Sequence, residues 1–125
     1  MSGRLPRLTR RGEFLRAASK GRKAARPGLV LQALPTGPGG PPLRVGFTAT
    51  KKIGGAVVRN RAKRRLREAA RLTLAAGAPP GWDLVLIARD ATATRPFTQL
   101  LGDLRGALRQ AGVPHTAAAV GSGNG

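Results

Sequence analysis

Cysteine and tyrosine are absent from this chain of 125 residues, and its only aromatic residues are three Phe and one Trp. Without cysteine there can be no disulfide, no thiolate metal site and no cysteine nucleophile. With so few aromatic residues, a core has to be packed from Leu, Val, Ile and Ala. No apolar run approaches the roughly 18 residues of a membrane-spanning helix, and residues 1–6 lack the apolar segment of a secretory signal. We therefore expect a cytoplasmic protein.

Acidic residues are also scarce, because five Asp and Glu stand against 23 Lys and Arg, for a net charge of +18. Such an excess costs self-repulsion and indicates a polyanionic partner. Nucleic acid is the first candidate, and an anionic membrane surface is the second. The single histidine, His115, lies in a tail-like segment and is not expected to act as a ligand or a base. The acids are scattered, so we expect no metal site and no catalytic residue in the protein; they are Glu13, Glu68, Asp83, Asp90 and Asp103.

The spacing of apolar residues and turn formers predicts three helices and three strands. We expect helices at 10–20, 56–75 and 96–111, strands at 28–34, 43–49 and 82–88, and a loop rich in Pro and Gly at 35–42. The strand at 43–49 alternates as a half-buried strand does, whereas the strand at 82–88 is apolar nearly throughout, as is typical of a strand covered on both faces.

This order of elements predicts an α/β domain of the two-layer α+β sandwich type, with a small mixed sheet packed by three helices. We expect a single RNA-binding domain over residues 1–115 and a disordered tail at 116–125.

The helix at 56–75 carries most of the functional signal. On a helical wheel, Val58, Ala62, Leu66 and Ala69 form a narrow apolar stripe, and most of the remaining circumference is cationic. Like charges four residues apart repel by a few tenths of a kcal/mol per pair, a cost that phosphate contacts would reverse. A solvated helix face is the alternative. Asn60 could read a base edge or cap the helix start. The apolar side has no Trp or Phe, which disfavours membrane insertion.

The stretch RVGFTATKKIGGAVVRNRAKRRLREAAR, residues 44–71, closely resembles the signature region of the bacterial ribonuclease P protein subunit. Its most specific part is the Arg-Asn-Arg core at 59–61 with the Lys-Arg pair at 63–64. Leu8, Phe14 and Gly21 match the family's first helix, and the strands at 29–34 and 83–89 match as well. The resemblance covers about residues 4–111.

The resemblance implies a protein that assists a catalytic RNA in removing the 5′ leader of precursor tRNA, with chemistry carried by the RNA and its Mg²⁺ ions. Its partners would be that RNA and precursor tRNA, with no membrane and no obligate protein partner. It also implies a left-handed crossover between parallel strands through the basic helix, against the general rule. The resemblance implies these RNA-binding residues: Lys51, Lys52, Arg59, Asn60, Arg61, Lys63, Arg64 and Arg67. We add Arg65 and Arg71 as further cations of the same helix.

The family also holds single-stranded leader in a cleft between the first helix and the sheet, often with several aromatics. Candidates for that role here are Phe14, Gln32 and Arg44, although Phe14 could equally be a core residue. Ala18 and Gln32 stand where aromatics are expected, so leader contact should depend more on charge than on stacking, which is worth about 1–3 kcal/mol per base. A non-enzymatic RNA-binding protein, of ribosomal-protein or RNA-chaperone type, is the alternative function.

Overall fold

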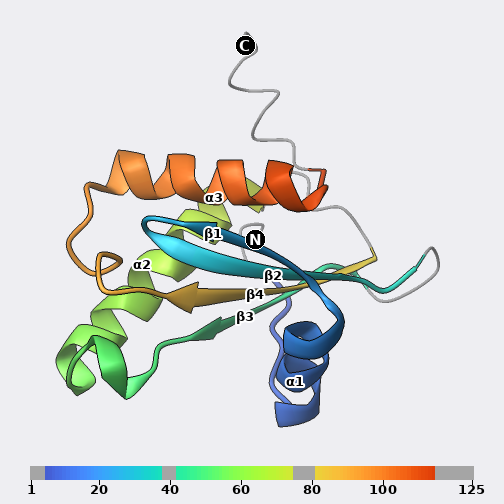
Figure 1. Cartoon of the computed structure of the whole chain (residues 1–125), viewed down its shortest axis with the longest axis horizontal. Coiled ribbons are helices and arrows are strands. Elements are labelled where there is room, and N and C mark those ends of the chain that lie inside the picture. Colours follow the sequence, from blue (N-terminus) through green and yellow to red (C-terminus); the bar gives the residue numbers. More distant parts are fainter. Residues whose placement is uncertain (1–4, 38–41, 75–80, 115–125) are drawn as a thin grey trace, which may run out of the picture.

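The structure, a computed structural model, describes residues 5–37, 42–74 and 81–114. All three predicted helices are present, and the sheet has one strand more than the sequence predicts (Figure 1). The elements are, in chain order, α1 (Arg11–Lys20), β1 (Arg22–Arg26), β2 (Leu29–Pro35), β3 (Arg44–Thr48), the 3-10 helix η1 (Lys51–Ile53), α2 (Ala56–Leu74), β4 (Trp82–Ala88) and α3 (Phe97–Ala111).

The sheet has the strand order β1-β2-β4-β3. β1 pairs with β2, and β2 with β4, in antiparallel fashion, whereas β3 and β4 are parallel. The predicted mixed sheet is therefore confirmed. β4 lies in the interior of the sheet and is buried along most of its length, which confirms that this apolar run is covered on both faces. The β3–α2–β4 unit is the one to which the predicted left-handed crossover applies.

Helices pack on both faces of the sheet (Figure 1). On one face, α2 and α3 cover the main core, in which Leu31, Leu86, Leu66 and Leu104 are fully buried. On the other face, α1 covers a smaller cluster built from Leu8, Ala17 and Val85, with Phe14 and Ile87 packed against it. The arrangement is the predicted α+β sandwich of three helices and one sheet, and α1 leaves part of its face of the sheet exposed.

Gly46 of β3 is buried although it lies on the opposite face of the strand from Val45. The Phe14 ring lies directly over it, and a Cβ at this position would overlap the ring carbons Cε2 and Cζ. Glycine is therefore required here by the close approach of α1. The same contact places Phe14 in the small cluster, as the core interpretation of this residue expects.

The helix ends agree with local signals. α3 ends at Gly112, whose φ of +81° is in the left-handed region that favours glycine. There the backbone N–H groups of Gly112 and Val113 donate to the carbonyls of Arg109 and Leu108. Four predicted features lie outside the described residues: the end of the basic helix at residue 75, the centre of the loop at 35–42, His115 and the tail at 116–125. Within the described residues, no helix has the length and apolar character needed to cross a bilayer.

Candidate nucleic-acid interface

The basic helix α2 is anchored by a continuous buried stripe. Ala62, Leu66 and Ala69 are fully buried, as the wheel predicts, and Val58 is partly buried against the main core. The last turns extend the stripe through Ala70, Thr73 and Leu74. Since this stripe faces the sheet and α3, the cationic side of the helix is directed toward solvent.

The turn that enters α2 belongs to the same surface. η1 places Lys51 and Lys52 on an exposed turn, and its N–H of Ile53 donates to the carbonyl of Thr50 at 3.2 Å. Gly54 follows with φ of +141°, a conformation that non-glycine residues rarely adopt, and this allows the chain to turn sharply into the helix. The two lysines are thereby joined to the start of α2 as one cationic surface.

The candidate RNA-binding residues differ in exposure. Arg59, Lys63 and Arg65 are partly buried, and the remaining candidates are exposed: Lys51, Lys52, Asn60, Arg61, Arg64, Arg67 and Arg71. We call this exposed set with Arg59 and Lys63 the α2 cationic surface. Its only carboxylate neighbour on the helix is Glu68.

Arg65 has partners within the protein. Its Nη2 donates to the backbone carbonyl of Arg95, and its guanidinium lies over the Phe97 ring, 5.8 Å from the ring centroid. Both partners belong to the start of α3 and the loop before it, so Arg65 ties α2 to α3. The helical wheel places Arg65 at one edge of the apolar stripe and Arg59 at the other edge, so it marks both arginines as the ones nearest the core. It does not distinguish Arg65 as the one with partners on α3.

Arg71 is also engaged, although on the surface. It makes two bonds to Glu68, from Nε to Oε1 at 3.1 Å and from Nη2 to Oε2 at 2.6 Å. The bonds from Arg71 lower the pKa of Glu68. Because both side chains are about half exposed, the pair contributes little to stability, but it offsets the positive charge at this end of α2.

Three other acidic residues also form ion pairs with arginines. Glu13 and Asp83 form ion pairs with Arg44, and Asp103 forms one with Arg95. Four of the five carboxylates are thus paired, and none of them except Glu68 lies on α2. Glu68 is therefore the only acid of α2 that offsets the positive charge of the α2 cationic surface.

The three leader candidates lie on the sheet face that α1 covers. Gln32 is opposite Val85 in the β2–β4 register, and both belong to the side of the sheet where Phe14 packs. Gln32 is partly exposed. Sequence reasoning did not single out Lys23, which pairs with Gln32 across β1 and β2 and is exposed; no pattern marked it, because β1 itself was not predicted.

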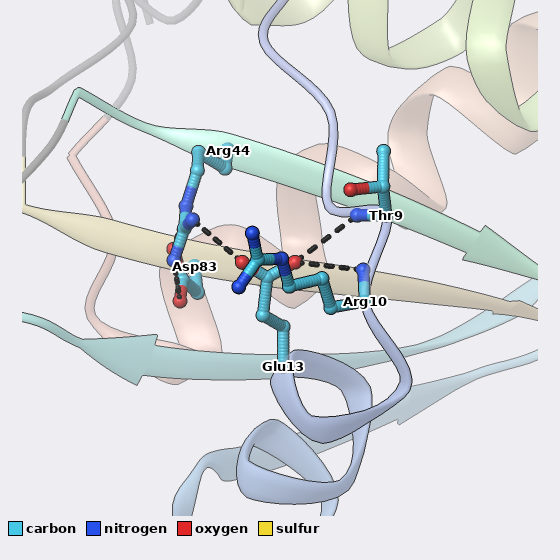
Figure 2. A network of polar contacts seen from close by, with 5 residues as sticks. All are labelled: Thr9, Arg10, Glu13, Arg44 and Asp83. Carbon is cyan, nitrogen blue, oxygen red and sulfur yellow. Dashed lines mark hydrogen bonds and ion pairs between the residues drawn. The ribbon is translucent and has the colours of Figure 1, made fainter.

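Arg44 is bound by two carboxylates (Figure 2). Its Nε and Nη2 donate to the two oxygens of Asp83 at 3.0 and 2.9 Å, and its Nη1 donates to Glu13 Oε2 at 2.8 Å. The bond to Asp83 is the main cause that raises the pKa of Arg44. The pKa of Glu13 is lowered, first by the backbone N–H groups of Arg10 and Thr9 and then by Arg44.

No metal site is evident in the parts of the chain that the structure describes. Residues 5–37, 42–74 and 81–114 contain no group of three His, Asp or Glu side chains that could hold an ion. The arrangement offers instead a rigid cationic helix for phosphate contacts and a separate sheet face, beside α1, with polar and apolar side chains.

Comparison with known proteins identifies the family to which the chain belongs. The family model described as Ribonuclease P matches residues 3–112. The chain is 57% identical over 113 residues to the "Ribonuclease P protein component" of Gluconacetobacter diazotrophicus, covering 90% of this chain and 97% of the relative. A relative of the same name from Streptomyces avermitilis is 42% identical over 111 residues, with 83% and 89% of the two chains covered.

Solved structures agree with the sequence matches. The RNase P protein of Staphylococcus aureus has a TM-score of 0.72 at 26% identity, over 88% of this chain and 98% of that one. The RNase P protein of Thermotoga maritima has a TM-score of 0.65 at 26% identity, over 80% and 92% of the two chains. The motif on α2, the α+β fold and these likenesses over nearly the whole length show that the chain belongs to the ribonuclease P protein family.

Proposed function

We propose that this chain is the protein component of ribonuclease P and binds the catalytic RNA through the α2 cationic surface. The observation that carries the proposal is the placement of that surface. A helix fixed to the core by one stripe presents Arg61, Arg64 and Arg67 to solvent, and its single acid is paired with Arg71. Arginine suits the task because its planar fork makes bidentate bonds to phosphate.

In this proposal the cleavage of the precursor tRNA is carried out by the RNA subunit with its Mg²⁺ ions. The role of the protein is electrostatic and positional. Cations of α2 that neutralise RNA phosphates release bound counterions, so the complex forms and keeps its shape at a lower Mg²⁺ concentration than the RNA alone needs. We place this assembly in the cytoplasm.

The second part of the proposal concerns the 5′ leader of precursor tRNA. Gln32 and Lys23 lie side by side on the α1 face of the sheet, where Phe14 is the nearest aromatic candidate. Phe14 is partly buried and packs over Gly46, so only part of its ring is open to a base. Leader binding in this protein therefore depends on polar and charged contacts more than on stacking.

The test is reconstitution with a ribonuclease P RNA at low Mg²⁺. The protein should stimulate cleavage of precursor tRNA, and the complex should bind substrate with a leader more tightly than substrate without one. Arg61→Ala combined with Arg64→Ala should reduce the stimulation. The matched control is Arg105→Ala combined with Arg109→Ala, which removes two exposed arginines from α3 and should not reduce it. Absence of stimulation, with equal binding of both substrates, would refute the proposal in favour of a non-enzymatic RNA-binding protein.

A further inference from the structure

Arg44 occupies the centre of a three-residue network that joins β3, β4 and α1 (Figure 2). It is the first residue of β3 and lies beside Asp83 in the parallel β3–β4 register. Arg44 binds both oxygens of Asp83 and one oxygen of Glu13, so the guanidinium links the sheet to the first turn of α1.

The partners of Arg44 leave it little capacity to act as a phosphate ligand. The Asp83 side chain is only 3% exposed, and a carboxylate buried to that extent is stable as an anion only with its partner in place. If Arg44 turned toward an RNA phosphate, Asp83 would keep its burial and lose its compensating charge. The free-energy cost of that separation keeps Arg44 in the network.

Glu13 uses its two oxygens for two different purposes. Oε1 accepts hydrogen bonds from the backbone N–H groups of Thr9 and Arg10, both at 3.0 Å, and so satisfies donors at the start of α1. Oε2 accepts the bond from Arg44 at 2.8 Å. One carboxylate therefore both begins the helix and fixes it to the sheet.

An apolar contact beside the network also links α1 to β3. Phe14 follows Glu13 on α1, and Gly46 lies two residues beyond Arg44 on the same face of β3. The Phe14 ring covers Gly46 so closely that no Cβ fits between them. Two consecutive residues of α1 are thus held by two alternate residues of β3, one through an ion pair and one through packing.

We propose that Arg44 is a positioning residue for the leader: through Glu13 it holds α1 at a set height over the sheet, and so sets the space in which Gln32 and its neighbours meet single-stranded RNA. This inference rests on the proposed function. In this role Arg44 acts on the leader through the position of α1 and not through a bond to the leader phosphates, whereas the sequence-based expectation for Arg44 is a direct leader contact.

The experiment compares two variants in the complex reconstituted with ribonuclease P RNA. Arg44→Lys keeps the charge but removes the planar fork that reaches both carboxylates. Glu13→Gln keeps an oxygen that can cap α1 but removes the ion pair with Arg44. The readout is the leader preference, defined as the Kd for substrate without a leader divided by the Kd for substrate with one. We expect both variants to lower it by about tenfold, with the affinity for ribonuclease P RNA unchanged.

The sign of the Glu13→Gln effect separates positioning from direct contact. If Arg44 were a phosphate ligand, removing its competing carboxylate would raise the leader preference. Asp90→Asn, which neutralises an exposed carboxylate of the connection between β4 and α3, controls for the gain of one positive charge and should leave the preference unchanged. A rise with Glu13→Gln beyond that control would overturn the inference.

The remaining outcomes are also decisive. If the wild-type complex shows no leader preference, the proposed leader role fails and this inference fails with it. If the wild type shows the preference and both variants keep it, only the positioning role of Arg44 is refuted. Circular dichroism monitors folding, and if Arg44→Lys does not fold, Glu13→Gln alone decides. A variant that was largely unfolded at the assay temperature would weaken binding to ribonuclease P RNA as well, so an unchanged affinity for that RNA shows that the variant is folded.

Discussion

Replacing Arg64 and Arg65 by alanine, one at a time, separates the two tasks that arginines perform on α2. The two residues are neighbours, their replacement removes the same charge, and the gain in helix propensity is the same small amount in each. Arg64 is exposed, whereas Arg65 binds the carbonyl of Arg95 and lies over Phe97. The two variants should therefore fail in different assays.

For Arg65→Ala the loss is in the stability of the free protein. A hydrogen bond from a charged group contributes about 1.5–3 kcal/mol, and a cation–π contact contributes about 0.5–1 kcal/mol at an exposed site. Because Arg65 is partly exposed, solvent screens part of the sum, and we expect a decrease of about 2 kcal/mol in the free energy of unfolding. In a chain of this size the melting temperature should fall by about 6–10 °C.

For Arg64→Ala the loss is in RNA affinity and in its salt dependence. Each phosphate contact that is removed lowers the slope of log K against log salt concentration by about 0.7–0.9. Binding to ribonuclease P RNA, measured by filter binding over a salt series well below both melting temperatures, should show that reduction for Arg64→Ala and not for Arg65→Ala. Thermal unfolding should rank the two variants in the opposite order.

If the two variants behave alike, Arg64 and Arg65 do not have different tasks on α2. Equal reductions of the salt slope, with an unchanged melting temperature for Arg65→Ala, would mean that Arg65 leaves its intramolecular partners and binds phosphate. An unchanged slope for Arg64→Ala would mean that the exposed side of α2 does not contact RNA at that position.

Three further outcomes are expected. Gly46→Ala should lower the free energy of unfolding by about 1–3 kcal/mol in a urea titration, because the new methyl group overlaps the Phe14 ring. The control is Gly12→Ala, whose Cβ meets nothing within 4 Å and which should cause no loss. Equal losses in the two variants would contradict the packing of Phe14 on Gly46. Gln32→Tyr should tighten leader binding in the reconstituted complex by about 1–3 kcal/mol through stacking, and an unchanged affinity in fluorescence anisotropy would count against the leader surface. The pKa of Glu13 is lower in the folded protein, so the contribution of its carboxylate to stability is present above the unfolded pKa of about 4.3 and is lost as the pH falls through the folded pKa. The melting temperatures of the wild type and Glu13→Gln should therefore differ at neutral pH and converge in acid. A difference that stays constant with pH would refute this contribution of Glu13.

Local patterns in the sequence were sufficient for much of the fold. The periodicity of apolar residues over α2 and α3, the apolar run of β4 and the glycine after α3 depend on contacts within one element or on the preference of one residue. For the same reason the α2 cationic surface was predictable, because residues on one helix have a known angular relation whatever the rest of the chain does.

The strand β1 could not be predicted, because its strand conformation depends on distant partners. Its five residues, RKAAR, bury only Ala24. β2 supplies its backbone pairing, and the two arginines reach across to α3, where Arg22 donates to the carbonyl of Ala111 at 2.9 Å and Arg26 to that of Gly106 at 3.1 Å. None of these contacts has a local pattern in the sequence.

The sequence by itself determined that this protein has a cationic helix of the ribonuclease P type, since composition, spacing and motif all lie within a short stretch of chain. Only the tertiary structure decided what each charge does. Arg44 and Glu13 are 31 positions apart, and Arg44 and Asp83 are 39 apart, yet they form one network. Coulomb attraction acts through space and burial strengthens it, so the residues that are neutralised, and those left to bind RNA, depend on which strands and helices the fold brings together.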